Sequence, residues 1–149
     1  MHCYLFDLDG TLADLTHRLH HIQPPEGAAK NWDAFFDACD GDAPISPVLT
    51  LAHHLMREVT LVFVSGRSDA TRKKTEAWLF KYGLGDGPGR LYMRKAGDHR
   101  PDNIVKGELL DQILAAGFKP IMAFDDRDQV VKMWRERGVH CAQVADGNF

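Results

Sequence analysis

Phe6-Asp7-Leu8-Asp9-Gly10-Thr11-Leu12 is the stretch of this 149-residue chain that decides its fold. Residues 3–6 before it form a short apolar run, typical of a central strand in a parallel sheet, and Gly10 permits the sharp turn that ends such a strand. Successive strand residues point to opposite faces, so Asp7 and Asp9 are expected to lie on one side. Because open α/β sheets bind ligands at the carboxyl ends of their strands, the stretch predicts a ligand site with two carboxylates.

Two carboxylates in this position suit the transfer of a phosphoryl group. Asp7 can attack phosphorus to form an aspartyl-phosphate, while Asp9 protonates the departing oxygen and later deprotonates the attacking water. Because the nucleophile and the phosphate are both anionic, a cation is needed, and Mg²⁺ prefers oxygen ligands. Further carboxylates are therefore expected later in the chain. The alternative is that both aspartates are ordinary turn residues beside a glycine.

Three later positions in the chain supply side chains that could bind the phosphate and the cation. The apolar run at residues 61–64 ends in Ser65-Gly66-Arg67, whose hydroxyl, amides and guanidinium can hold phosphate oxygens. Another run at residues 121–124 ends in Asp125-Asp126, and Lys106 lies at a predicted helix start. Each position also has an ordinary role, as a helix cap, a loop acid or a solvated lysine. Their coincidence after successive strands favours a shared site.

These elements, in this order, resemble the four motifs of the haloacid dehalogenase superfamily of phosphohydrolases. The resemblance implies that Asp7 is the nucleophile and Asp9 the general acid/base. It implies phosphate contacts from Ser65 and Lys106, and it leaves open which residue of the acidic pair binds Mg²⁺ directly. The metal set implied by the resemblance is Asp7, Asp9, Asp125 and Asp126.

Most of the chain is further similar to the 3′-phosphatase domain of phage polynucleotide kinase/phosphatase, with residues 19–46 the least similar. The segments that carry this likeness are residues 64–67, 97–106, 123–135 and 138–144. The likeness implies roles in the active site for Arg18, Arg67 and Asp102; the structural alternatives are a helix-surface arginine, an ion pair and an N-cap. The full set of substrate contacts implied is Thr11, Arg18, Ser65, Gly66, Arg67 and Asp102.

The alternation of apolar runs with helical patterns predicts an α/β fold with a doubly wound parallel sheet and a minimal cap. Strands are predicted near residues 3–8, 60–64, 90–93, 120–124 and 139–144. We expect one phosphatase domain over residues 1–149, with residues 19–46 as a small helical lid. Within that segment Trp32, Phe35 and Phe36 are expected to pack a short helix onto the body, with nucleobase stacking as the alternative.

Composition fits a globular enzyme, with 26% charged and 44% hydrophobic residues and a formal charge of −3. The first predicted strand begins almost at Met1 and no apolar run reaches membrane-spanning length, so neither a signal peptide nor membrane association is expected. The three cysteines lack metal spacing, which indicates reduced thiols in a cytoplasmic protein. No phosphate-binding kinase loop occurs, so a phosphatase without a kinase half is expected. The oligomeric state is left open.

Three functions remain open. The first is an Mg²⁺-dependent phosphomonoesterase that removes 3′-phosphates from nucleic-acid ends or 3′-nucleotides, favoured by a small lid and by ten basic against five acidic residues over positions 66–106. In this hypothesis Arg94 contributes to a basic surface for the polymer. The second is a phosphatase for a small metabolite, such as a 5′-nucleotide or a sugar phosphate. The third is a receiver-like signalling module that keeps its aspartyl-phosphate.

Overall fold

The protein, described here from a computed structural model covering residues 1–85 and 87–149, is built on a five-stranded sheet. The strands are β1 (His2–Phe6), β4 (Thr60–Ser68), β5 (Leu91–Arg94), β6 (Lys119–Asp125) and β7 (Cys141–Gln143). Their spatial order is β5-β4-β1-β6-β7, and every adjacent pair is parallel. The predicted doubly wound parallel sheet is confirmed, and each predicted strand lies within a few residues of its expected position.

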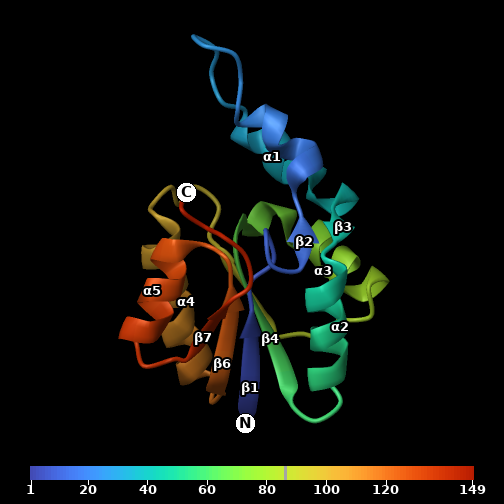
Figure 1. Cartoon of the computed structure of the whole chain (residues 1–149), viewed down its shortest axis with the longest axis vertical. Helices are drawn as coiled ribbons and strands as arrows, with labels where there is room; N and C mark the ends of the chain where they lie inside the picture. Colours follow the sequence, from blue (N-terminus) through green and yellow to red (C-terminus); the bar gives the residue numbers. More distant parts are fainter. Residues whose placement is uncertain (86) are drawn as a thin grey trace.

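Helices cover both faces of the sheet (Figure 1). On one face lie α2 (Ser46–Leu55) and α3 (Arg72–Lys81), the latter entered through the short 3₁₀ helix η3 (Asp69–Thr71). On the other face lie α4 (Asp102–Ala115) and α5 (Asp128–Glu136). The chain changes face between β5 and α4, which makes the sheet doubly wound.

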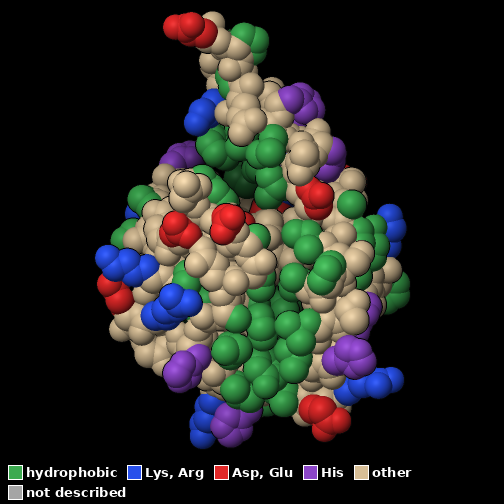
Figure 2. All heavy atoms as spheres, in the orientation of Figure 1, with side chains coloured by type: hydrophobic (Ala, Val, Ile, Leu, Met, Phe, Trp, Pro, Cys, Tyr) green, Lys and Arg blue, Asp and Glu red, His purple; other side chains and the backbone are tan. Residues whose placement is uncertain are grey.

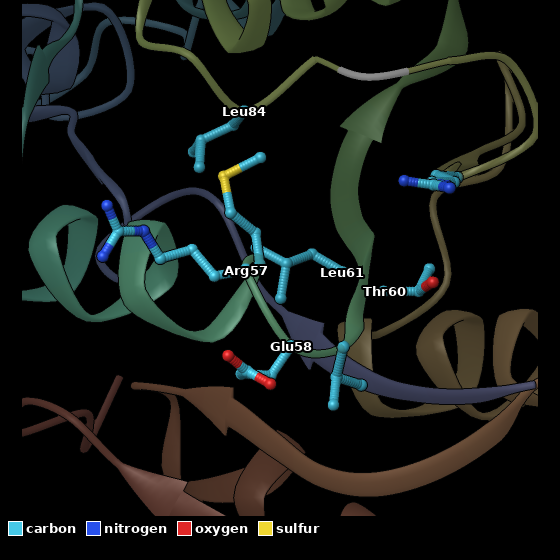
Figure 3. Close-up of a pocket in the computed structure, with 8 residues that line it drawn as sticks. Arg57, Glu58, Thr60, Leu61 and Leu84 are labelled. Atoms are coloured by element: carbon cyan, nitrogen blue, oxygen red, sulfur yellow. The ribbon is translucent and has the colours of Figure 1, made fainter.

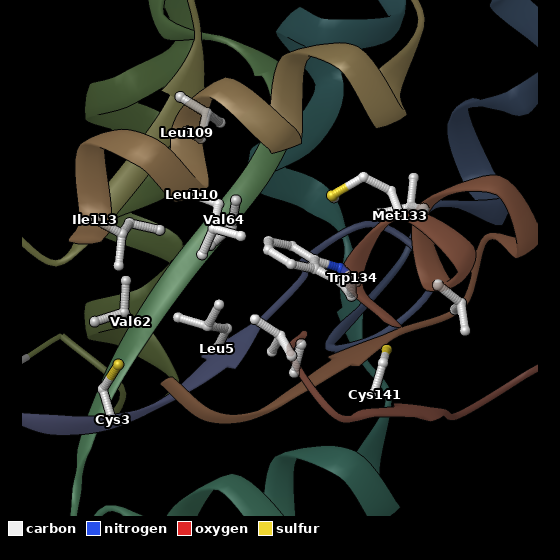
Figure 4. Packing of buried hydrophobic residues seen from close by; sticks show 14 of the residues in the cluster. Cys3, Leu5, Val62, Val64, Leu109, Leu110, Ile113, Met133, Trp134 and Cys141 are labelled. Atoms are coloured by element: carbon white, nitrogen blue, oxygen red, sulfur yellow. The ribbon is translucent and has the colours of Figure 1, made fainter. Parts of the chain in front are cut away.

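The central strand β1 is buried on both faces, and its side chains alternate between two cores. Cys3 and Leu5 pack into the core shared with α4 and α5 (Figure 4), whereas Tyr4 and Phe6 belong with the core beneath α2 and α3. Trp134 of α5 is 1% exposed and lies in the first of these cores. Because both faces are filled, the ligand site is confined to the ends of the strands.

An insertion stands over the carboxyl end of the sheet, between β1 and α2 (Figure 1). Its elements are η1 (Thr16–His21), α1 (Trp32–Asp37) and η2 (Ala38–Gly41). A short antiparallel ribbon closes its base, formed by β2 (Ala13–Asp14) and β3 (Ala43–Pro44). The insertion occupies the region predicted as a lid, and Phe35 of α1 is buried whereas Trp32 is 47% exposed.

The register of the strands brings the motif residues together. Phe6 of β1 pairs with Phe63 of β4 and with Phe124 of β6, so the residues that follow in each strand meet at one edge. β4 continues to Ser68 with a register irregularity after Ser65, so Ser65, Gly66 and Arg67 belong to the end of this strand. Across the described residues, none of the helices combines the length and the apolar character that crossing a membrane requires.

Candidate active site

Asp7 and Lys106 form a buried ion pair directly beyond the end of β1. The Lys106 ammonium donates from Nζ to Asp7 Oδ1 at 2.7 Å and to Asp125 Oδ2 at 2.8 Å, and Lys106 is 2% exposed. The Thr11 hydroxyl donates to the other oxygen of Asp7, Oδ2, at 2.9 Å. Thus one carboxylate at the end of the central strand is held from both sides, by α4 and by the turn after β1.

Asp7, Asp125 and Asp126 form an acidic cluster in which one oxygen of each lies within 4.8 Å of the others. Burial raises the pKa of Asp7 well above its ordinary value, and the neighbouring Asp125 raises it further, whereas Lys106 lowers it. Burial and Asp125 also raise the pKa of Asp126 to about 6. Burial lowers the pKa of Lys106, but Asp125 and Asp7 hold it above its usual range.

The acidic cluster carries three carboxylates against one ammonium, so it has an excess of negative charge when all are ionised. Its donor atoms are all oxygens, which is the ligand chemistry that Mg²⁺ prefers. A divalent cation would supply the compensating charge that the raised pKa values of Asp7 and Asp126 indicate is missing. The side chains therefore fit a magnesium site.

The loop after β6 fixes the acidic pair. Asp125 Oδ1 accepts the backbone N–H of Asp126 at 2.9 Å, and Asp125 Oδ2 accepts the indole N–H of Trp134 at 3.1 Å. Gly10 approaches from the opposite side with φ +85°, and a Cβ built there would lie 2.1 Å from Asp126 Oδ2. Gly10 is therefore needed both for the turn after β1 and for the space that Asp126 occupies.

Asp9 belongs to a second cluster. Its Oδ1 accepts from Arg18 Nη2 at 2.7 Å and from Arg67 Nε and Nη2 at 2.9 and 2.7 Å. Burial opposes ionisation, yet the guanidiniums of Arg67 and Arg18 hold the pKa of Asp9 below its ordinary value. The structure therefore places the Asp9 carboxylate in this second cluster and not among Asp7, Asp125 and Asp126, and the predicted contact of Asp9 with a metal ion stays a prediction.

The different direction of Asp9 has a simple physical cause. β1 ends at Phe6, so the alternation of faces that predicted a common side for Asp7 and Asp9 does not extend beyond the strand. In the turn that follows, Asp9 is drawn to the two guanidiniums. Its side chain is 22% exposed, so it remains open to solvent while Arg18 and Arg67 are fully buried.

Asp42 is a further member of this second cluster that the sequence interpretation missed. Its Oδ2 accepts from Arg18 Nη2 at 2.8 Å and Arg67 Nη2 at 2.9 Å, and its Oδ1 accepts from Arg18 Nε at 2.8 Å. We call Asp9, Asp42, Arg18 and Arg67 the arginine cluster. A single aspartate between a glycine and an alanine has the pattern of a loop residue, so no sequence signal marked Asp42.

Ser65, Gly66 and Asp102 line the edge of the site at the end of β4. The Ser65 hydroxyl oxygen accepts the backbone N–H of Arg67 at 3.1 Å. A Cβ on Gly66 would lie 2.5 Å from Asp102 Oδ1, so a glycine is needed for this close approach. Asp102 Oδ2 also accepts from Arg127 Nη1 at 3.0 Å. Asp102 thus holds the loop after β6 and the end of β4 in one place.

Arg94 has a different role from the one expected for a basic surface. Its side chain is 13% exposed, and it donates to the Gly66 carbonyl at 2.8 Å, to the Arg100 carbonyl at 2.6 Å and to the Asp102 carboxylate. These contacts occupy the guanidinium inside the fold. The expectation that Arg94 binds the polymer backbone is therefore replaced by a role in holding the segment around Gly66.

The site opens where the insertion meets the body. Figure 2 shows the surface hollowed at this place, with hydrophobic side chains around the opening and acidic side chains beside it. A separate cavity of about 200 Å³ lies at the opposite end of the sheet, where β4 begins at Thr60 (Figure 3). Arg57, Glu58 and Leu61 line that cavity, and it includes none of the residues of the acidic or arginine clusters.

Solved structures of related fold are phosphatases and other hydrolases. The class C acid phosphatase from Bacillus anthracis, determined with tungstate bound, has 13% identity and a TM-score of 0.64 over 87% of this chain and 53% of its own. A haloacid dehalogenase-like hydrolase from Streptococcus pneumoniae has 14% identity and a TM-score of 0.64 over 95% of this chain and 83% of its own. The fold is therefore that of the haloacid dehalogenase-like hydrolases.

Other relatives are more similar in sequence. A chain of the Pnkp1/Rnl/Hen1 RNA repair complex is 33% identical, with a TM-score of 0.81 over 99% of this chain and 43% of its own. A protein of Autographa californica nuclear polyhedrosis virus named "Putative bifunctional polynucleotide kinase/RNA ligase" is 30% identical over 134 residues, which are 89% of this chain and 17% of that protein. The chain thus spans less than half the length of these relatives.

The model of the polynucleotide kinase PNKP phosphatase domain matches residues 1–149. The chain belongs to this family, and it is a phosphatase domain of the haloacid dehalogenase type. The resemblance inferred from the sequence motifs is confirmed.

Proposed function

We propose that the protein is a magnesium-dependent phosphomonoesterase that acts through an aspartyl-phosphate and removes 3′-phosphates from nucleic-acid ends. The observation that carries the proposal is the buried contact of Asp7 with Lys106, beside the carboxylates of Asp125 and Asp126. Family membership supports the class of reaction. In this proposal Asp7 and Asp9, which both follow β1, serve as nucleophile and acid, and Lys106 of α4 stabilises the charge.

In the proposed reaction, a carboxylate oxygen of Asp7 attacks phosphorus, and the bond between phosphorus and the 3′-oxygen breaks. With substrate bound, the negative charge of the phosphate opposes the effect of the two guanidiniums and favours the protonated form of Asp9, which donates its proton to the departing 3′-oxygen; this oxygen leaves as a hydroxyl group. In the second half, Asp9 takes a proton from water, the water oxygen attacks phosphorus, and Asp7 is released as a carboxylate together with inorganic phosphate. The two halves balance, because Asp9 regains the proton that it gave.

The surrounding groups supply charge stabilisation. Lys106, with its ammonium already 2.7 Å from Asp7, stabilises the oxygens of the phosphoryl group, together with the Ser65 hydroxyl and the nearby amides. A bound Mg²⁺ would be held by Asp7, Asp125 and Asp126, and it would reduce the repulsion between nucleophile and phosphate. The hydrogen bonds from Arg18 and Arg67 hold the carboxylate of Asp9, which lies two residues after the nucleophile in the chain.

Nucleic-acid ends are the proposed substrate class because of the relatives and the small insertion. The names of two relatives refer to a polynucleotide kinase and RNA ligase and to an RNA repair complex. The insertion contains a single α-helix of six residues, α1, so it covers the site less than a separate cap domain would. Removal of a 3′-phosphate leaves the 3′-hydroxyl that end-joining reactions consume. The proposed location is the cytoplasm, in keeping with free buried thiols at Cys3, Cys39 and Cys141.

A substrate panel tests this proposal. Phosphate release is measured from an oligonucleotide with a 3′-phosphate, from its 5′-phosphate isomer, from 3′- and 5′-mononucleotides and from a sugar phosphate, with and without Mg²⁺. We expect the highest kcat/KM for the 3′-phosphate oligonucleotide, with activity abolished by chelation and by Asp7→Asn. Equal or better turnover of 5′-mononucleotides would favour the metabolite phosphatase, and a stable phosphoprotein without turnover would favour the receiver-like module.

A further inference from the structure

The arginine cluster joins the insertion to the general acid. Asp9 follows β1, Arg67 lies in β4, Arg18 lies in η1 at the start of the insertion, and Asp42 follows η2 at its end. Two guanidiniums and two carboxylates therefore meet from four segments. Asp42 is 2% exposed and Arg18 and Arg67 are 0% exposed, so these three members of the cluster are held away from solvent, which keeps the hydrogen bonds between them strong.

Asp42 contacts neither the acidic cluster nor Lys106 within the hydrogen bonds of the described chain, but it shares both arginines with Asp9. Arg18 Nη2 donates to Asp9 Oδ1 at 2.7 Å and to Asp42 Oδ2 at 2.8 Å. Arg67 Nη2 donates to the same two oxygens at 2.7 and 2.9 Å. Each guanidinium thus bridges Asp9, which follows β1, and Asp42, which lies at the end of the insertion.

The position of Asp42 is itself fixed by the fold. Its backbone carbonyl accepts the indole N–H of Trp78 at 2.8 Å, and His17 Nε2 lies 2.7 Å from its Oδ1. The next residue, Ala43, pairs with Asp14 in the ribbon at the base of the insertion. Asp42 is therefore anchored to α3, to η1 and to the ribbon, and it accepts hydrogen bonds from both guanidiniums.

Arg18 adds a link to the helix of the insertion. Its Nη1 donates to the Phe35 carbonyl at 3.2 Å, and its guanidinium carbon lies 4.3 Å from the centre of the Phe35 ring. The orientation of Arg18 thus depends on α1 as well as on Asp42. A change in the position of the insertion relative to the sheet would therefore alter the position of Asp9 through the guanidinium of Arg18.

We propose that Asp42 is a positioning residue that, by holding Arg18 and Arg67, aims the carboxylate of Asp9 at the oxygen that leaves from phosphorus. This inference rests on the proposed function, in which Asp9 is the acid. With Asp42 in place, each guanidinium donates to both carboxylates, and the Asp9 carboxylate is held in one orientation. Without it, the guanidiniums can turn wholly to Asp9 and withdraw it from the leaving oxygen.

The dependence of rate on the leaving group distinguishes positioning of the acid from a general structural role. Hydrolysis of a 3′-phosphate releases an alcohol as the leaving group, and its oxygen needs a proton as the bond to phosphorus breaks. The leaving group of p-nitrophenyl phosphate is the anion of an acidic phenol, which departs without needing that proton. A misdirected Asp9 therefore slows the oligonucleotide far more than the phenyl ester, whereas a distorted site slows both alike.

The experiment compares kcat/KM for a 3′-phosphate oligonucleotide and for p-nitrophenyl phosphate in wild type, Asp42→Asn and Asp40→Asn. Asp40 is the matched control, an exposed acid of η2 that forms none of the hydrogen bonds of the arginine cluster. We expect Asp42→Asn to lower the ratio of the two values about tenfold to a hundredfold, and Asp40→Asn to leave it unchanged. His17, whose side chain is 44% exposed, lies beside Asp42, and His17→Gln should lower the ratio by a smaller factor than Asp42→Asn does.

Circular dichroism melting of each variant accompanies the kinetics. A wild-type ratio in folded Asp42→Asn overturns the inference, and if that variant does not fold, a wild-type ratio in His17→Gln does so instead. Equal losses on both substrates also overturn it, because they indicate a structural role alone. If the wild-type protein hydrolyses neither substrate in Mg²⁺, the proposed function has failed, and that outcome is distinct from an unchanged ratio in an active enzyme.

Discussion

Replacement of Gly10 by alanine should damage the metal site more than the fold. The backbone at Gly10 has φ +85°. This conformation costs an alanine roughly 1–2 kcal/mol, partly offset by about 0.4–1 kcal/mol from the reduced freedom of the unfolded chain. The net loss of about 1 kcal/mol corresponds to a Tm lowered by about 2–4 °C for a domain of this size.

The contact with Asp126 adds a second effect. The new Cβ would lie 2.1 Å from Asp126 Oδ2, whereas ordinary contacts begin at 3.4 Å, so one of the groups must move by about 1.3 Å (3.4 − 2.1). A displacement near 1 Å in a catalytic site can cost on the order of a hundredfold in rate. We therefore expect Gly10→Ala to raise the Mg²⁺ concentration for half-maximal activity and to lower kcat/KM by about this factor.

Gly117→Ala is the matched control for the backbone effect. Gly117 has φ +92°, and a Cβ built there meets nothing within 4 Å. Calorimetry should show similar losses of Tm in the two variants, whereas Mg²⁺ titrations of activity should separate them. If Gly10→Ala has the Mg²⁺ dependence and kcat/KM of Gly117→Ala, the placement of Asp126 in the metal site is refuted.

The remaining predictions concern the nucleophile, pH and Arg94. Asp7→Asn should lower kcat on the order of a thousandfold or more with the fold retained, because the amide keeps the shape but does not attack phosphorus; wild-type activity would refute its role. The pKa of Asp126 is raised from 3.8 to about 6, so the folded state binds more protons and the metal-free protein loses stability as pH rises through this window. Mg²⁺ competes with that proton, and the Tm gain on adding Mg²⁺ should therefore grow over the same window, a trend that Asp126→Asn should weaken. Arg94→Ala should reduce kcat/KM for the oligonucleotide and for p-nitrophenyl phosphate alike, because it releases Gly66 and Asp102; a loss confined to the oligonucleotide would restore the polymer-binding role.

The amino-acid sequence alone was sufficient for the fold and for the centre of the site. Short apolar runs separated by helical patterns define a parallel α/β sheet, and the carboxyl ends of neighbouring parallel strands always meet at one edge. For this reason Asp7, Ser65 and Asp125 could be grouped before any coordinates, and Lys106 followed from the order of the motifs. These residues lie in or next to regular elements, where position in the chain determines direction.

Only the tertiary structure decided the partners of the side chains beyond the regular elements. Asp9 lies past the end of β1, where alternation no longer applies, and its direction depends on two arginines from distant segments. Asp42 has no pattern to distinguish it from a loop acid, and Arg94 looks like a surface base until its carbonyl and carboxylate partners are known. Sequence patterns report the periodicity of a single segment, whereas the pairing of buried charges depends on which segments the fold brings into contact.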